Sequence, residues 1–233
     1  TSFQITDRDS FRAFLGLRRG DAVPDGQTIS DFRERLIATK SFESLFDTFL
    51  AHLQKEHGLA LAKQGVMVDA SFAEVPRQRN SRADNALIKA GEVPQALEDN
   101  AKVKAHKDLD ARWTKKHGQS FYGYKNHIGV DKLHKIIRKW AATDASPHDS
   151  QKLDDILDAS NTGNQVWADS AYRSAEIEAK LAAKGMKSRI HRRAARNRPL
   201  SPTQEAANTT RSRVRARVEH VFGHQENSMG RKI

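Results

Sequence analysis

The chain has 233 residues, no cysteine, and 40 Lys or Arg against 29 Asp or Glu, which gives a formal charge of +11. Without cysteine the chain holds no disulfide, no cysteine-ligated zinc and no thiol nucleophile, and no run of about 18 apolar residues is available to span a membrane. The positive charge favours a polyanionic partner, and the lack of a secretion signal predicts a cytoplasmic location.

Residues 1–65 predict a small all-helical domain. Apolar residues recur at helical spacing over residues 8–19 and again over residues 42–53. Thr28 followed by Asp31 resembles a capping box and predicts that a helix begins at Thr28. The next domain is expected to begin where this helical period stops.

From residue 66 onward the hydrophobic pattern becomes that of strands. An apolar segment at residues 66–72 predicts one strand, and residues 121–130 and 136–142 predict an antiparallel pair. Further along the chain we expect a helix over 147–160, a strand over 165–168, a helix over 175–184, a strand over 186–190 and a long helix over 203–223. The order β-β-β-α-β-α-β-α predicts an α/β domain with a mixed sheet over residues 66–233.

Two stretches hold most of the basic residues. Residues 75–118 contain ten Lys or Arg against six acids, are rich in Asn, Gln, Ala and Gly, and predict a basic, flexible insertion. Residues 185–217 contain ten Lys or Arg and one acid, Glu205. This second stretch indicates either a phosphate-contacting surface or a solvated basic tail. The candidates for contact with DNA in it are Arg192, Arg193, Arg211 and Arg215.

The three tryptophans differ in their neighbours. Trp140 and Trp167 lie in apolar segments and are expected in the core. Trp113 lies in the basic insertion, so it is the best candidate to stack on a nucleic-acid base.

Three acidic residues lie in or beside the predicted core elements. Asp69 is inside an apolar strand, Asp169 follows another, and Glu219 lies on the long helix. A carboxylate in such a place is costly unless it is paired or binds a cation, and carboxylates holding two Mg²⁺ ions can clamp the oxygens of a phosphoryl transfer. Asp69 could instead end a strand at a turn, and Asp169 could cap the helix that follows it. Glu219 could pair with Arg215, one helical turn earlier.

Four motifs carry these residues. They are Val68-Asp69-Ala70-Ser71, Tyr122-Gly123-Tyr124-Lys125-Asn126-His127, Ala168-Asp169-Ser170-Ala171-Tyr172 and Arg215-Ala216-Arg217-Val218-Glu219-His220-Val221-Phe222. Together they resemble the DDE transposases of bacterial insertion sequences, and they are most similar to the group named after insertion sequence 5. The similarity covers nearly the whole chain, with residues 75–118 least constrained, and the strand order resembles that of the ribonuclease-H-like fold.

The resemblance implies a function for the acids. Asp69, Asp169 and Glu219 would be the catalytic triad that binds Mg²⁺, which Mn²⁺ can replace. Water would attack a phosphodiester at the end of the element, and the freed 3′-hydroxyl would then attack target DNA. Lys125 and His127 would lie near the first aspartate and contact phosphate, the alternative being that they occupy an exposed strand face.

The resemblance also implies the partners. These would be double-stranded DNA, as element ends and as target, and further copies of the chain in a homo-oligomer, with no membrane involved. Residues 1–65 would bind the element ends, mediate dimer contact or pack on the catalytic domain.

Two features depart from the family's pattern. The family carries a lysine seven residues after the glutamate, where this chain has Glu226, and an acid there would repel phosphate. The chain also begins at Thr1 without methionine, and we expect a fragment of a complete transposase. Two alternative functions therefore stay open: a catalytically impaired or truncated DNA-binding copy, and a ribonuclease-H-like nuclease without strand transfer.

Overall fold

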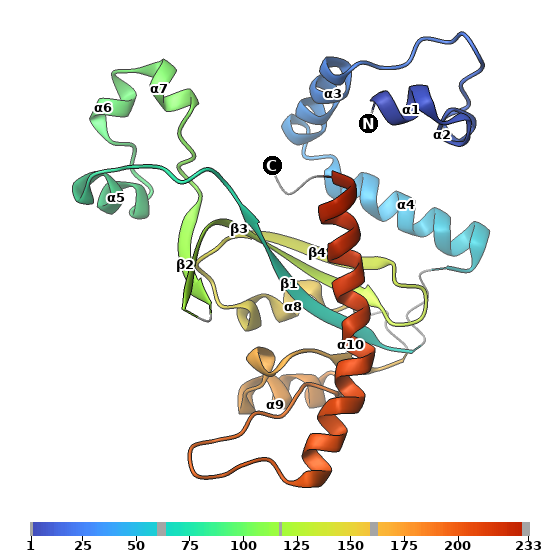
Figure 1. Cartoon of the computed structure of the whole chain (residues 1–233), viewed down its shortest axis with the longest axis vertical. Coiled ribbons are helices and arrows are strands. Elements are labelled where there is room, and N and C mark those ends of the chain that lie inside the picture. Colours follow the sequence, from blue (N-terminus) through green and yellow to red (C-terminus); the bar gives the residue numbers. More distant parts are fainter. Residues whose placement is uncertain (1, 60–63, 117, 159–162, 230–233) are drawn as a thin grey trace. The chain divides into compact units, whose positions relative to one another are not determined.

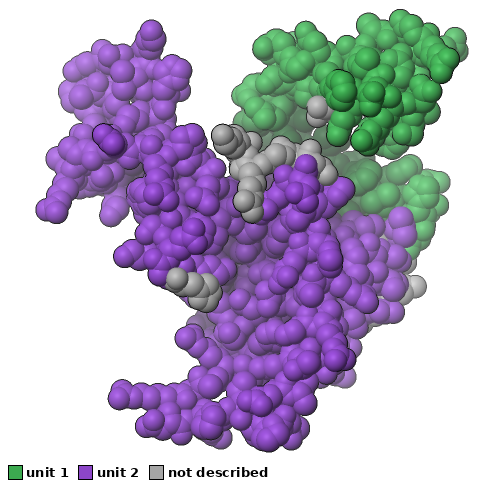
Figure 2. All heavy atoms as spheres, viewed as in Figure 1, with its two compact units in different colours: residues 1–58 green, residues 59–233 purple. Residues whose placement is uncertain are grey.

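A computed structural model describes residues 2–59, 64–116, 118–158 and 163–229 of the chain. The chain divides into two compact units. They are residues 1–58 and residues 59–233, which are coloured separately in Figure 2.

The first unit consists of helices. They are α1 (Ser2–Asp7), α2 (Asp9–Phe14), α3 (Gly26–Ala38) and α4 (Phe42–His57). The predicted start at Thr28 is wrong, because the helix begins two residues earlier. Asp25 is the N-cap, and its carboxylate accepts a hydrogen bond of 2.7 Å from the backbone N–H of Thr28.

The second unit is built on a six-stranded mixed sheet (Figure 1). Its strands are β1 (Val66–Glu74), β2 (Arg112–Lys116), β3 (Gln119–Asp131), β4 (Ile137–Asp144), β5 (Gln165–Trp167) and β6 (Lys187–Ser188). β3 pairs antiparallel with β1, β2 and β4, whereas β5 lies parallel to β1 and β6 parallel to β5. The predicted antiparallel pair and the predicted parallel additions are confirmed. This mixed α/β architecture is consistent with a ribonuclease-H-like core.

The second unit also contains helices and 3₁₀ turns. They are α5 (Arg82–Lys89), α6 (Gln95–Glu98), α7 (Ala101–Ala105), the 3₁₀ turn η1 (Asp149–Lys152), α8 (Leu153–Ile156), the 3₁₀ turn η2 (Ser170–Tyr172), α9 (Ala175–Ala183) and α10 (Pro202–Met229). The single helix predicted over 147–160 is wrong. The structure has the 3₁₀ turn η1 followed by the short helix α8 in this segment. The helix α8 ends because Leu157 takes an extended backbone with φ −78° and ψ 130°. The last two residues of that prediction lie outside the described residues.

The insertion predicted to be flexible contains regular elements. A capping box at Ser81 and Asp84 begins α5, and the polar strand β2 pairs with the start of β3. The prediction missed β2 because its sequence, Arg-Trp-Thr-Lys-Lys, lacks the alternation of a half-buried strand.

The core lies on both faces of the sheet, because successive strand residues point to opposite sides. One face is covered by α8 and α9, and the buried residues there are Val66, Val68 and Val166 on the strands and Ala168 just after β5. The other face is covered by α10, and the buried residues there are Met67, Ile128, Val130, Trp167, Val218 and Phe222. Burial of each Val, Ile, Met or Phe side chain among them stabilises the fold by about 1.5–3 kcal/mol. The core therefore fixes which face of β1 and β5 meets α10.

Gly123 marks the place where four strands come together. It is the register partner of Glu74 on β1 and of Arg112 on β2, and its carbonyl accepts the N–H of Ala145 just after β4. Its φ is +144°, and a Cβ at this position would collide with the carbonyl oxygen of Ala73. A side chain here would push β1 and β3 apart.

Candidate active site

The first two acids of the predicted triad are placed by strand register. In the parallel pair of β1 and β5, Val66 lies opposite Val166 and Met67 opposite Trp167. Continued by two residues, the same register brings Asp69 beside Asp169. Both follow Met67 and Trp167 by two positions, so the alternation turns both toward the face covered by α10. Burial is the main cause of the raised pKa of Asp69, and the nearby charge of Asp169 adds to it.

The third acid is joined to this pair through an arginine. A guanidinium nitrogen of Arg215 on α10 lies 3.2 Å from a carboxylate oxygen of Asp69, and the same nitrogen lies 3.7 Å from a carboxylate oxygen of Glu219. Glu219 remains 66% exposed, one helical turn beyond Arg215. The alternative that Glu219 pairs with Arg215 is confirmed, and the arginine also brings Glu219 into the neighbourhood of Asp69.

The ionisation of Asp69 depends on opposing effects. Burial raises the pKa of its carboxyl group and is the largest influence, while the positive charge of Arg215 and a hydrogen bond from the backbone N–H of Ala70 lower it. Desolvation prevails, so the pKa of Asp69 lies above its usual value of 3.8. A buried carboxylate that one arginine only partly compensates is favourable for binding a further cation.

The donor set suits a hard divalent cation, although it is not closed around one. Carboxylate oxygens are the ligands that Mg²⁺ prefers, and the charge of Arg215 already lies between two of these carboxylates. Among the residues that the structure describes, no group of three His, Asp or Glu side chains is arranged to hold a single ion. Glu219 would have to turn inward from its exposed position to complete a site.

Asp169 has a second, structural function. Its carboxylate accepts a hydrogen bond of 2.8 Å from the N–H of Ala171 and caps the 3₁₀ turn η2. The alternative that Asp169 is an N-cap is therefore confirmed. One oxygen accepts this bond, which fixes the orientation of the carboxylate at the end of β5.

Residues 61–232 match the family described as the transposase DDE domain. The chain belongs to this family. A transposase for insertion sequence element IS1106 from Neisseria meningitidis serogroup B is 34% identical over 178 residues, which cover 76% of this chain and 62% of that relative. The chain thus spans about three fifths of the relative's length. No solved structure matches the chain. Membership of the group named after insertion sequence 5 stays a prediction.

Two residues beside the acids of this DDE domain were not singled out by the sequence analysis. Tyr172 is 1% exposed, and its hydroxyl has no hydrogen-bond partner among the described residues. Burial and the charges of Asp149, Asp69 and Asp169 raise its pKa well above 10, so the hydroxyl keeps its proton. Its position in the Ala-Asp-Ser-Ala-Tyr motif, three residues after Asp169, was the available signal.

His191 is the second such residue. Burial and the charges of Arg215 and Arg211 lower its pKa, so the ring is neutral at pH 7. Its backbone N–H donates to the carbonyl of Ala168 at 3.1 Å, and a ring nitrogen lies 3.4 Å from the hydroxyl of Ser212 on α10. His191 therefore connects the end of β5 to α10. Nothing in the sequence around it distinguished it from the neighbouring arginines.

The structure places Lys125 and His127 inside the DDE domain. Lys125 is 6% exposed and His127 is 0% exposed, so the alternative of an exposed strand face is wrong. The ammonium group of Lys125 donates to the carbonyl of Pro147 at 2.6 Å and lies 2.9 Å from the carboxylate of Asp149. A nitrogen of His127 lies 3.0 Å from the hydroxyl of Thr143. The ammonium group of Lys125 is occupied within the fold, and the other ring nitrogen of His127 is buried without a partner among the described residues. The burial of both side chains argues against the predicted contact with phosphate.

The arginines of the basic stretch separate into two groups. Arg215 lies among the acids, whereas Arg192 and Arg193 are exposed on the loop before α10. Arg211 is half-buried, and burial together with the charges of Arg173, Arg192 and Arg189 lowers its pKa. These guanidinium groups lie close enough to repel one another, so this surface favours an anion.

No helix in the described part of the chain combines the length and apolar character needed to cross a bilayer.

Proposed function

We propose that the chain is the catalytic part of an insertion-element transposase that cleaves DNA at the element ends and joins it to target DNA. The observation that carries the proposal is the meeting of Asp69, inside β1, with Asp169, just after the parallel neighbour β5, under a helix that carries Glu219. Three acids on these elements, in a member of the DDE family, support metal-dependent chemistry on phosphodiesters.

The chemistry would be shared between the metal and the chain. Bound Mg²⁺, or Mn²⁺ in its place, would activate water and stabilise the charge that develops on the phosphate. Asp69 and Asp169 would hold it from two rigid strands, and Glu219 from α10. Arg215 holds Asp69 and Glu219 near one another, and its guanidinium would compete with the ion for their oxygens. Tyr172 keeps a protonated hydroxyl near both aspartates.

We further propose a ribonuclease-H-like core, double-stranded DNA as the partner, and Arg192, Arg193 and Arg211 as contacts to its phosphates. The order β4–β3–β1–β5–β6, with antiparallel pairing in its first part and parallel pairing in its second, supports the core. The clustered guanidinium groups support the DNA contacts.

We also propose a homo-oligomer formed through the first unit. The helices α3 and α4 contain no buried residue. Phe42, Leu45 and Phe49 recur at helical spacing along α4 and are 44%, 50% and 52% exposed. An apolar stripe of this kind is typical of an interface between copies.

The experiment that tests the proposed function is cleavage of a supercoiled plasmid carrying the element ends, with Mg²⁺ or Mn²⁺ titrated in. Asp169→Asn keeps the shape of the side chain and removes the charge that would bind metal. We expect metal-dependent nicking by the wild-type chain and a loss of about a hundredfold or more in Asp169→Asn.

The matched control is Asp154→Asn, which changes an exposed aspartate on α8 that pairs with Lys184 and Lys180. Nicking should persist in this variant. Equal nicking by Asp169→Asn and the wild type would refute the proposal. If the wild type binds DNA without nicking it, Glu226→Lys would show whether this acid is what impairs the chain.

A further inference from the structure

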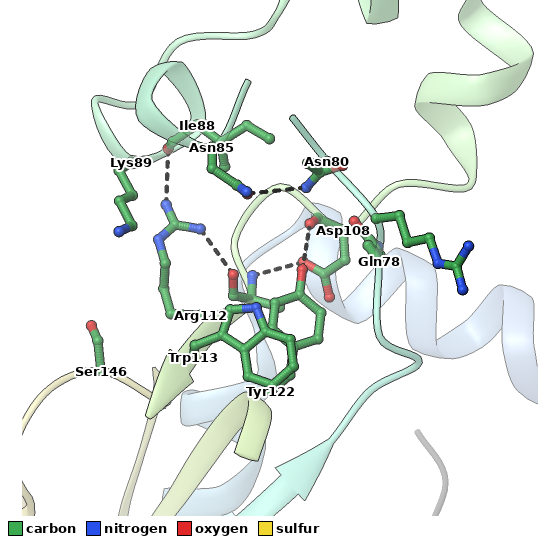
Figure 3. Close-up of a pocket in the computed structure, with 12 residues that line it drawn as sticks. Gln78, Asn80, Asn85, Ile88, Lys89, Asp108, Arg112, Trp113, Tyr122 and Ser146 are labelled. Atoms are coloured by element: carbon green, nitrogen blue, oxygen red, sulfur yellow. Dashed lines mark hydrogen bonds between the residues drawn. The ribbon is translucent and has the colours of Figure 1, made fainter. Parts of the chain in front are cut away.

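A cavity of about 770 Å³ lies between the insertion that follows β1 and the edge of the sheet. Figure 3 shows α5, β2 and the segment after β1 enclosing it. Its walls are formed by Gln78, Arg79, Asn80, Asn85, Ile88, Lys89, Asp108, Ala111, Arg112, Trp113, Tyr122 and Ser146. None of the acids of the candidate active site is among them, so the cavity is a separate site.

One wall of this cavity is aromatic. Trp113 on β2 is 49% exposed, and its ring lies 5.0 Å from that of Tyr122 on β3. The guanidinium of Arg77 lies 5.5 Å from the centre of the Trp113 ring. Such an aromatic platform, flanked by a cation, suits a flat π-system such as a nucleobase.

A second wall carries amide groups. The side-chain nitrogen of Asn80 donates to the side-chain oxygen of Asn85 at 3.3 Å, and the oxygen of Asn80 accepts from Lys107 at 2.7 Å. The side-chain nitrogen of Asn85 makes no hydrogen bond within the described residues, which leaves its two donors for a ligand. Amide groups beside an aromatic platform can bind the edge of a base.

The lining also has a positive charge. It contains three cations, Arg79, Lys89 and Arg112, and one acid, Asp108. Arg112 donates to the carbonyl oxygens of Leu109, Ala111 and Ile88, which leave its charge unneutralised.

The acid of the lining, Asp108, is held through one carboxylate oxygen by neutral donors of the fold. It accepts from the N–H of Ala111 at 2.9 Å and from the hydroxyl of Tyr124 at 2.6 Å. Arg79 and Lys89 have no acidic partner within the described residues. The cavity thus offers a flat aromatic surface, free amide donors and unpaired cations together.

We infer that this cavity binds a single unpaired nucleotide of the bound DNA. The base stacks on Trp113, Asn85 contacts its edge, and Arg79 and Lys89 contact its phosphate. The volume falls in the range of sites that enclose one small ligand, and a paired base in a duplex cannot present its face to the ring. This inference rests on the proposed function only in taking DNA as the partner.

The test uses the full chain in EDTA, so that no metal-dependent cleavage takes place. The probes are a short duplex with one bulged 2-aminopurine and the same duplex without the bulge. We expect the wild type to bind the bulged duplex about tenfold more tightly and to quench the 2-aminopurine fluorescence by stacking. Trp113→Ala should abolish both effects, and Trp113→Phe should retain part of each.

Lys115→Ala is the matched control for charge, because Lys115 is an exposed cation on β2 outside the cavity. It should weaken binding to both duplexes equally, whereas Lys89→Ala should reduce the preference for the bulge. Equal binding of both duplexes by the wild type, or an unchanged preference in Trp113→Ala, would overturn the inference. Because Asp169→Asn should keep the preference and lose nicking, failure of this site is distinguishable from failure of the proposed function.

Discussion

The raised pKa of Asp69 shows that burying its carboxylate costs the fold stability at neutral pH. Because its pKa is raised above 3.8 by burial, the folded chain holds this proton more strongly than the unfolded chain does. The group contributes its full stability at pH values below the pKa that it has in the unfolded chain. This contribution is lost as the pH rises through the higher pKa that it has in the folded chain. At neutral pH the ionised side chain therefore destabilises the fold.

The first prediction concerns this cost. Asp69→Asn should raise the melting temperature of the metal-free chain at pH 8, and the gain over the wild type should shrink toward pH 4, because Asn carries no charge at either pH. The measurement is thermal unfolding followed by circular dichroism at both pH values. Added Mg²⁺ should stabilise the wild type more than the variant. A variant less stable than the wild type at pH 8 would mean that the pair with Arg215 outweighs burial.

The second prediction concerns Lys125, whose ammonium group is buried against Asp149 and Pro147. Lys125→Met would leave the Asp149 charge without its partner, which costs about 3 kcal/mol of stability. We expect a decrease of roughly 5–10 °C in melting temperature. The salt dependence of DNA binding should not change, because the side chain does not reach the surface. If Lys125→Met instead weakens the salt dependence of DNA binding and does not lower the melting temperature, Lys125 contacts phosphate after all.

At the scale of elements, one side chain of α10 anchors the backbone of Arg192 in the loop before that helix. The amide of Asn208 on α10 accepts the backbone N–H of Arg192 at 2.9 Å and donates to its carbonyl at 2.8 Å. This pair of bonds fixes the backbone next to Arg193 and leaves both arginine side chains exposed. A loop anchored in this way can present cations to a DNA backbone at little further entropic cost.

The third prediction follows from this loop. The double substitution of Arg192→Ala and Arg193→Ala should weaken binding to all duplexes alike. It should also reduce the slope of log K against log salt by about 2, roughly one for each guanidinium group that no longer meets a phosphate. The slope is measured by fluorescence polarisation over a salt series. Lys180→Ala is the control, because Lys180 already pairs with Glu176 and Asp154 and should leave the slope unchanged.

Strands and helices could be predicted to very different degrees. The β1 and β3 segments and the long α10 were found from the sequence because their apolar residues repeat at the period of the element they form. β2 was missed because Trp113 is its only large apolar residue, and its pairing with β3 supplies what its own pattern lacks. The helix predicted over 147–160 was too long. Its apolar residues Leu153 and Ile156 are buried against the sheet, but the α-helix that carries them has only four residues.

At the scale of the whole molecule, Phe42, Leu45 and Phe49 form an exposed apolar stripe along α4. The fourth prediction rests on the proposed homo-oligomer: the wild type should have the molar mass of a dimer, and Phe42→Ser with Phe49→Ser should shift it toward a monomer. The measurement is light scattering coupled to size-exclusion chromatography, because molar mass responds directly to assembly. Ser44→Ala, on an exposed position of the same helix, is the control. An unchanged mass with a lower melting temperature would mean that the stripe packs within one chain.

The sequence by itself determined the family and the order of most elements, and it proposed the three acids. These depend on local patterns: Asp69 inside an apolar strand, Asp169 after another, and Glu219 four residues after Arg215. Only the tertiary structure decided what each side chain meets. Strand register brought Asp69 beside Asp169, and packing of α10 placed Arg215 between Asp69 and Glu219. The folding of the sheet buried Lys125 and left a cavity beside Trp113. Interactions between residues a hundred positions apart depend on how whole elements pack, and no local period records that.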